Sequence, residues 1–167
     1  MCENCPYNEQ QHLNGTIYFN GGNRLNFENN NSETLLVFQA PGVEEWKNGE
    51  AIHRQVNKRA TGSRIAKSWE LTDRVRANYD ITNVVQCFPG KYKNGRDKKP
   101  RKLAIKKCME NLSVTIAEKN YRRIILFGKV AQDAFEELDN LGFDEGIIER
   151  VKHPSGGLSN NDLNDLW

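Results

Sequence analysis

Thr34-Leu35-Leu36-Val37-Phe38-Gln39-Ala40-Pro41-Gly42 is the stretch that decides the fold. Its first five residues are a short, continuous apolar run, which is typical of a strand buried on both faces, and Pro41-Gly42 ends it. Similar runs occur at 81–87 and 123–127, and a fourth candidate strand spans Ile147 to Lys152. These four segments are the expected strands of one sheet.

Helical patterns separate the candidate strands. A helix is expected from Ser63, a second after Pro100, and a third over 131–141, whereas residues 43–62 are expected to be mostly loop. Strands that alternate with helices predict a three-layer α/β/α sandwich around a four-stranded, mainly parallel sheet. Ligands bind such sheets beyond the carboxyl ends of the strands. Those ends are 39–42, 83–89, 128 and 153–155.

The composition is that of one soluble, globular domain. The chain has 167 residues, of which 28% are charged and 37% hydrophobic, and no apolar stretch approaches the roughly 20 residues that span a bilayer. The N-terminus MCENCPYNEQ has neither the basic nor the apolar segment of a signal peptide. We therefore expect a cytoplasmic, monomeric protein with no membrane partner and a single domain over 1–167.

Four cysteines are the strongest chemical signal. Cys2 and Cys5 form a C-x2-C pair, Cys87 closes the apolar run at 81–87, and Cys108 lies in the next predicted helix. Disulfides are less favoured because nothing indicates an oxidising compartment. Four thiolates can hold zinc or a four-iron cluster, and spacing alone does not choose between them. Residues 1–33 would form an N-terminal lobe that binds this metal and packs on the domain.

Basic residues are concentrated in one place although the net charge is only +2. The stretch 91–107 contains nine lysines and arginines and a single acid, Asp97. Such a cluster can neutralise phosphates, and a solvated surface is the simpler alternative. The residues that we expect to contact phosphates are Arg96, Lys98, Lys99, Arg101 and Lys102.

Six short motifs occur in an order that resembles one known family. They are F-Q-A-P-G-V-E-E at 38–45, T-N-V-V-Q-C-F-P at 82–89, N-G-R-D-K-K-P at 94–100, the late Cys108, L-F-G-K-V-A at 126–131 and H-P-S at 153–155. Together they resemble the uracil-DNA glycosylase superfamily, and most closely its iron–sulfur branch, often called family four. That resemblance implies a [4Fe–4S] cluster on Cys2, Cys5, Cys87 and Cys108, with zinc as the alternative.

The resemblance also implies a reaction and roles for the residues. The protein would act in base-excision repair by hydrolysing the N-glycosidic bond of uracil in DNA, after the nucleotide has flipped out of the helix. Ala40-Pro41-Gly42 would cradle that nucleotide, and Asn83 would face the Watson–Crick edge of uracil. His153 would stabilise the departing uracil anion, and the turn with Ser155 would press on the DNA.

The chain departs from the family where catalysis is concerned. The family reads G-E-A-P-G, and here the catalytic glutamate position holds Gln39, which is neutral and cannot act as a general base. Ala40 stands where another branch has an aspartate, so Glu44 and Glu45 are the nearest substitutes. The aromatic residue that stacks on the base is also replaced. Its candidate substitutes are Ile52, Trp46 and Phe88.

These departures leave other functions open. The chain could bind DNA or a nucleotide without hydrolysis, act on another deaminated or alkylated base, or be a zinc-stabilised structural domain. Iron and sulfide in the protein would exclude the last of these.

Overall fold

The computed structural model describes residues 5–7, 10–13, 16–19, 27–136 and 144–167. Its centre is a sheet with the strand order β4-β3-β5-β6, formed by Thr34–Phe38 (β3), Asp80–Asn83 (β4), Arg123–Phe127 (β5) and Ile148–Val151 (β6). All neighbouring strands are parallel, with Phe38 opposite Asn83 and Val37 opposite Leu126. The predicted parallel α/β fold is confirmed.

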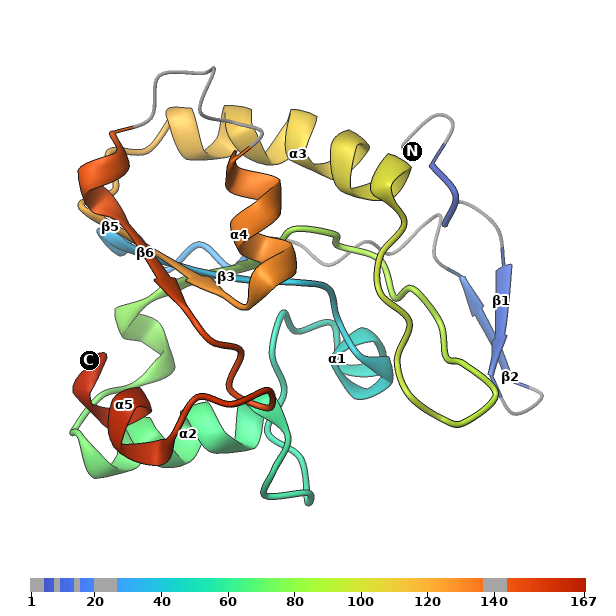
Figure 1. Ribbon diagram of the computed structural model, residues 1–167, viewed down its shortest axis with the longest axis horizontal. Coiled ribbons are helices and arrows are strands. Elements are labelled where there is room, and N and C mark those ends of the chain that lie inside the picture. Colours follow the sequence, from blue (N-terminus) through green and yellow to red (C-terminus); the bar gives the residue numbers. More distant parts are fainter. Residues whose placement is uncertain (1–4, 8–9, 14–15, 20–26, 137–143) are drawn as a thin grey trace.

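Alternating residues of the central strands build two cores, one on each face of the sheet. Leu35 and Val37 of β3 pack in a core beneath Lys102–Ala117 (α3) and Lys129–Glu136 (α4), which we call the α3/α4 core. Leu36 and Phe38 pack in the α2/α5 core, beneath Thr61–Leu71 (α2) and Asn160–Asp165 (α5). Figure 1 shows the two helix pairs on opposite sides of the sheet, which is the expected sandwich.

Three elements differ from their predicted form. Val43–Asn48 is a helix (α1) rather than loop, and it buries Glu45 and Trp46 before Gly49 ends it in a left-handed conformation. Strand β4 ends at Asn83 rather than at residue 87. The chain leaves the strand there while the N–H groups of Val84 and Val85 still donate to the carbonyls of Phe38 and Gln39. The short helix α5 was not predicted.

Other predicted elements agree with the structure or fall partly outside it. Gln10–Leu13 (β1) and Thr16–Phe19 (β2) pair antiparallel and lie within the expected N-terminal lobe, 1–33. Helix α4 confirms the first part of the helix expected over 131–141, and the end of that helix lies outside the described residues. Short 3-10 turns cover Arg76–Asn78 (η1) and Glu145–Ile147 (η3). No helix in the described ranges is long and apolar enough to cross a bilayer.

Candidate functional site: a cavity at the carboxyl edge of the sheet

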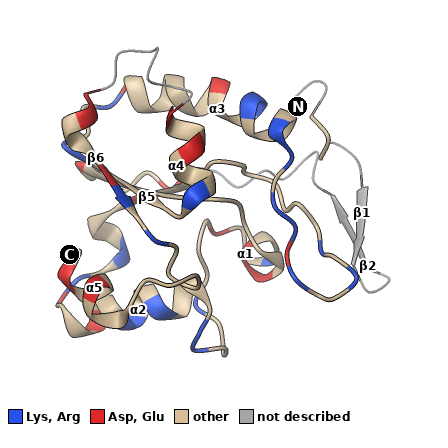
Figure 2. Ribbon diagram, in the orientation of Figure 1, with Lys and Arg blue, Asp and Glu red and all other residues tan. Residues whose placement is uncertain are grey.

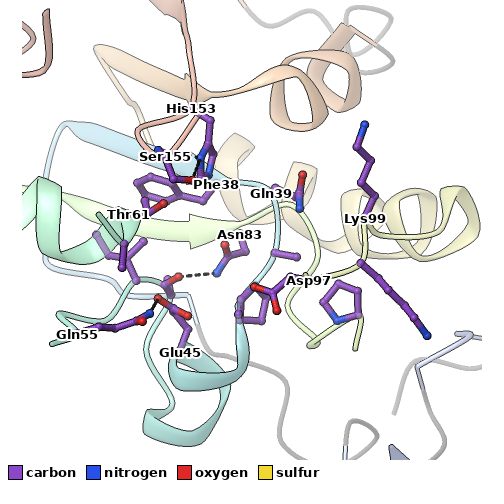
Figure 3. Close-up of a pocket in the computed structure, with 18 of the residues that line it drawn as sticks. Phe38, Gln39, Glu45, Gln55, Thr61, Asn83, Asp97, Lys99, His153 and Ser155 are labelled. Carbon is purple, nitrogen blue, oxygen red and sulfur yellow. Dashed lines mark hydrogen bonds between the residues drawn. The ribbon is translucent and has the colours of Figure 1, made fainter. Parts of the chain in front are cut away.

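A cavity of about 530 Å³ lies beyond the carboxyl ends of β3, β4 and β6. Segments from both faces of the sheet line it, including α1, the loop before α2 and the basic loop before α3. Every residue that we predicted to catalyse or to bind the nucleotide contributes to its wall. They are Gln39, Ala40, Pro41, Gly42, Asn83, His153 and Ser155. Figure 3 shows how Gln39, Asn83 and the pair His153 and Ser155 converge from separate elements.

Asn83 presents an unpaired acceptor at the base of this cavity. It is the last residue of β4, it is 1% exposed, and its Nδ2 donates to the carbonyl oxygen of Ala51 over 3.0 Å. That carbonyl can only accept, so the amide is assigned with Oδ1 on its other side. Oδ1 is buried and has no hydrogen-bond partner among the described residues. Such an atom costs about 1–3 kcal/mol until a donor reaches it.

A salt bridge fixes the loop that orients Asn83. The guanidinium of Arg76 binds the carboxylate of Glu28 through two hydrogen bonds of 2.8 and 2.6 Å and also donates to the Ile52 carbonyl over 2.9 Å. Glu28 in turn accepts from the backbone N–H of Ala51 over 2.8 Å. The peptide at 51–52 is therefore held from both sides, and the Ala51 carbonyl that binds Asn83 cannot easily turn away.

His153 follows β6 and presents its imidazole from the opposite wall. Its Nδ1 lies 3.3 Å from the backbone nitrogen of Ser155 and 2.9 Å from the Ser155 hydroxyl. A backbone N–H can only donate, so Nδ1 is the acceptor and the ring proton is assigned to Nε2. Gly128, with φ of +82°, lets β5 approach closely, since a Cβ there would lie 2.9 Å from His153 Cβ. Burial lowers the pKa of His153, which favours the neutral ring.

Two carboxylates line the cavity, and neither stands at the usual catalytic position. Glu45 is 8% exposed and accepts from Nε2 of Gln55 over 2.9 Å and from the His53 N–H over 3.4 Å. Asp97 lies across Gly42 from it, with one oxygen 2.8 Å from the Lys91 ammonium. Glu44 does not line the cavity, is partly buried and pairs with Lys47. The structure thus separates the two proposed substitutes, because only Glu45 reaches the cavity.

A family model describes this combination of sheet and cavity. The model of the uracil DNA glycosylase superfamily matches residues 25–167, which is most of the chain. The chain belongs to the uracil DNA glycosylase superfamily. No curated protein matches the sequence. Membership supports a glycosylase-type hydrolase whose substrate is DNA.

The surface that would face the base differs from expectation in this member of the superfamily. Of the three candidates for stacking, Ile52 lines the cavity, whereas Trp46 and Phe88 are buried in the α3/α4 core. Phe38 also lines the cavity and stacks on Phe127, with ring centroids 4.6 Å apart. Sequence reasoning missed Phe38 because it was assigned only to the strand. Its place directly before Gln39 could have indicated that it reaches the site.

Sequence reasoning also missed Gln55 and Asp97. Both line the cavity, yet Gln55 was assigned to a featureless loop and Asp97 was noted only as the single acid of a basic stretch. No local pattern marks Gln55, whose role depends on a contact with α1. Asp97 was detectable as the one exception to the charge of its surroundings.

The basic stretch 91–107 lies next to the cavity of this glycosylase-like protein. Figure 2 shows lysines and arginines along the loop that precedes α3 and at the start of that helix. Lys98 and Lys99 line the cavity itself. Arg96, Arg101 and Lys102 are exposed on the same segment and lie outside the cavity lining.

The cysteines of this superfamily member gather on the α3/α4 side. Cys5 and Cys87 are buried in that core, and the half-buried Cys108 packs against it, while Cys2 lies outside the described residues. Tyr7 accepts a hydrogen bond from the Arg101 N–H over 2.8 Å, which ties the Cys5 segment to the start of the helix that carries Cys108. Thiols from three separate segments therefore share one region, as a tetrathiolate site requires. Within the described part of the chain, no three cysteine, histidine or carboxylate side chains are grouped as metal ligands.

Proposed function

We propose that this protein hydrolyses the N-glycosidic bond between uracil and deoxyribose in DNA and leaves an abasic site. The observation that carries the proposal is the buried, unpaired Oδ1 of Asn83 at the base of the cavity. Uracil carries an N–H donor at N3, which would satisfy this oxygen. Cytosine has an unprotonated nitrogen at the same ring position. Its lone pair would face the lone pairs of Asn83 Oδ1, and no hydrogen bond could form between them. The arrangement therefore favours the deaminated base.

His153 would act on the leaving group. When the C1′–N1 bond breaks, its electron pair stays with the ring, and uracil departs as an anion. A neutral imidazole with its proton on Nε2 can donate a hydrogen bond to a carbonyl oxygen of that anion, and a buried site strengthens such a bond. The lowered pKa of His153 keeps this neutral form available at physiological pH.

The basic stretch would hold the DNA backbone on either side of the flipped nucleotide. Lys98 and Lys99 at the cavity, with Arg96, Arg101 and Lys102 beyond it, would replace counterions on successive phosphates. Affinity for a uracil-containing oligonucleotide should then fall steeply as salt rises from about 50 to 200 mM. An affinity that does not change over this range would contradict the assignment.

Cys2, Cys5, Cys87 and Cys108 would hold a [4Fe–4S] cluster that fastens the N-terminal segment to the domain. The shared region of three of these thiols supports this ligand set, and zinc is the alternative metal. Iron and acid-labile sulfide in anaerobically purified protein, both reduced in Cys108→Ser, would support the cluster. Zinc without sulfide would show instead that these cysteines bind zinc.

The test of the reaction is an anaerobic single-turnover assay on an oligonucleotide with one uracil, either single-stranded or opposite guanine. Alkaline cleavage reports the abasic product. Asn83→Ala should reduce the rate by about 10- to 100-fold, which corresponds to the loss of 1–3 kcal/mol of hydrogen bonding. Asn111→Ala is the matched control, because Asn111 is exposed on α3 and its side chain donates to the Lys107 carbonyl of the same helix.

Gln39 supports a second candidate function, which is binding of uracil-containing DNA without cleavage. A neutral side chain at the usual carboxylate position suits a protein that recognises uracil in DNA without cleaving it. Tight, Asn83-dependent binding with no cleavage by folded, metal-loaded protein would favour this function. Activity gained on Gln39→Glu would then show that the cavity is otherwise intact.

A further inference from the structure

We propose that Glu45 is the carboxylate that binds and deprotonates the attacking water. This inference rests on the proposed hydrolysis and supplies the base that Gln39 cannot provide. Glu45 lines the same cavity as Asn83 and His153, but it enters from α1, an element that the sequence did not predict.

The hydrogen bonds of Glu45 leave one carboxylate oxygen available. Oε1 accepts both described bonds, from the Gln55 amide and the His53 N–H, at 2.9 and 3.4 Å. Oε2 has no hydrogen-bond partner among the described residues and lies against Gly42, where an added Cβ would be 2.7 Å from it. An oxygen in this position can accept a proton from a water molecule in the cavity.

Glu45 also lacks the cation that usually accompanies a buried carboxylate. No lysine, arginine or histidine in the described chain forms an ion pair with it, although it is only 8% exposed. Asp97, its neighbour across Gly42, is by contrast paired with Lys91 and is about half exposed. A buried carboxylate without a counter-ion costs free energy and is a recurring feature of functional sites. The difference singles out Glu45 as the base.

Gln55 is the positioning residue for this carboxylate. Its backbone is fastened to α2 at both polar atoms, because the Ser63 hydroxyl accepts from the Gln55 N–H and donates to the Gln55 carbonyl, each over 2.8 Å. The side-chain amide of Gln55 then reaches Oε1 of Glu45, as Figure 3 shows. Rotation of the carboxylate would break this bond, so Oε2 stays directed to the Gly42 side.

The proposed step balances in atoms and charge. The water oxygen forms a bond to C1′ while the C1′–N1 bond breaks and its electron pair leaves with uracil. One water proton passes to Oε2 of Glu45, and the hydroxyl group remains on C1′ of the abasic sugar. The uracil anion takes a proton from solvent after release, and Glu45 returns its proton to solvent.

Glu45→Gln is the decisive variant because it keeps an acceptor for Gln55 and His53 and removes only the basic oxygen. In single-turnover assays we expect a rate about 100-fold or more below wild type, the usual contribution of a general base. The affinity for uracil-containing DNA and the melting temperature should stay close to wild type. Glu44→Gln is the matched control and should keep the wild-type rate, since Glu44 does not line the cavity and is bound to Lys47.

The pH profile separates a base from a merely structural residue. The wild-type rate should rise with pH as a carboxylate ionises, and Glu45→Gln should lose this acidic limb. Gln55→Leu should be slower than wild type and keep the limb, because it misplaces the base without removing it.

The outcomes distinguish this inference from the proposed function. Wild-type cleavage together with a near-wild-type rate in Glu45→Gln would overturn the role of Glu45 alone. Equal losses of rate, DNA affinity and thermal stability in that variant would also overturn it in favour of a structural role. A wild-type protein that is folded and metal-loaded but does not cleave any uracil substrate would overturn the hydrolysis itself.

Discussion

Gly42 lies between the carboxylates of Glu45 and Asp97, and the methyl group of an alanine at this position would test their arrangement. Its backbone has φ of −77°, which alanine adopts without strain, so the substitution acts through space alone. The added Cβ would lie 2.7 Å from Oε2 of Glu45 and 3.2 Å from Oδ2 of Asp97. We expect Gly42→Ala to displace the Glu45 carboxylate and lower the single-turnover rate about tenfold, a loss of roughly 1.4 kcal/mol in transition-state stabilisation.

The control for this substitution lies at the opposite end of α1. Asn48→Ala changes an exposed residue of α1 that bonds only to the Glu44 carbonyl, and it should leave the rate unchanged. Circular dichroism would verify that both variants fold. A Gly42→Ala enzyme as fast as wild type would show that the space beside Gly42 is not used in the reaction.

At the scale of elements, the two central strands could be predicted from the sequence, whereas the contacts between the strands and the loops could not. Strands β3 and β5 match the predicted runs at 34–38 and 123–127 to the residue, because strands buried on both faces are continuously apolar. Helix α1 was missed because it has six residues and buries only Glu45 and Trp46. The bond from Asn83 to Ala51 joins residues 32 positions apart, and no local pattern encodes such a contact.

The same reasoning explains how much of the site could be foreseen. Motif order predicted that Gln39, Asn83 and His153 would converge, since they follow three parallel strands. It did not predict which carboxylate accompanies them, because Glu44 and Glu45 are adjacent in sequence and only the helical geometry of α1 places Glu45 in the cavity wall and Glu44 beside Lys47. The partners of Asn83 and Glu45 come from the loop 50–55, where sequence periodicity is absent.

The Glu28–Arg76 salt bridge gives a prediction for the loop that orients Asn83. Arg76→Lys retains the charge but cannot form the two parallel bonds to Glu28 together with the bond to the Ile52 carbonyl. We expect a modest stability loss of about 1 kcal/mol, because Arg76 is partly exposed and screened by solvent. The larger effect should be on the preference for uracil over cytosine, measured as the ratio of the cleavage rates on the two bases.

Measuring single-turnover rates on uracil and cytosine oligonucleotides checks this prediction. Arg54→Lys is a suitable control, since Arg54 belongs to the same loop but forms an exposed pair with Glu70. If Arg76→Lys keeps the wild-type preference for uracil, the loop holds its position without the salt bridge.

At the scale of the whole molecule, Asp80 connects three parts of the chain. It is completely buried at the start of β4 and accepts hydrogen bonds from Lys119, from the Tyr121 hydroxyl over 2.6 Å, and from the N–H groups of Asn30 and Ser32. Burial alone would raise the pKa of Asp80, but the hydrogen bonds from Lys119, Tyr121 and the backbone outweigh it and hold the pKa below its ordinary value.

This lowered pKa predicts how the fold responds to acid. The unfolded chain takes up the Asp80 proton near pH 4, before the folded protein does, so the stabilisation is complete above pH 4 and is lost as pH falls through the folded pKa. Asp80→Asn should cost about 3 kcal/mol at pH 7, because it leaves Lys119 without its buried partner. It should also flatten the decline of unfolding free energy below pH 4.

Urea unfolding at a series of pH values measures both effects. Asp133→Asn is the control, because Asp133 pairs with Lys129 on the surface of α4 and should change stability by a few tenths of a kcal/mol. An Asp80→Asn protein with the acid sensitivity of wild type would assign that sensitivity to other groups, among them His153, whose pKa burial also lowers.

The segments that form the cavity wall lie far apart in the sequence, so the ribosome synthesises them at very different times. Gly42 and Glu45 emerge early, Asn83 and Lys99 follow, and His153 with Ser155 comes only after β6. Because β6 must dock on β5 to bring the imidazole into place, a nascent chain has the groups proposed to bind a base before it has the group proposed to act on the departing uracil. On the proposed function, a chain that stops before β6 should therefore be unable to leave abasic sites in DNA.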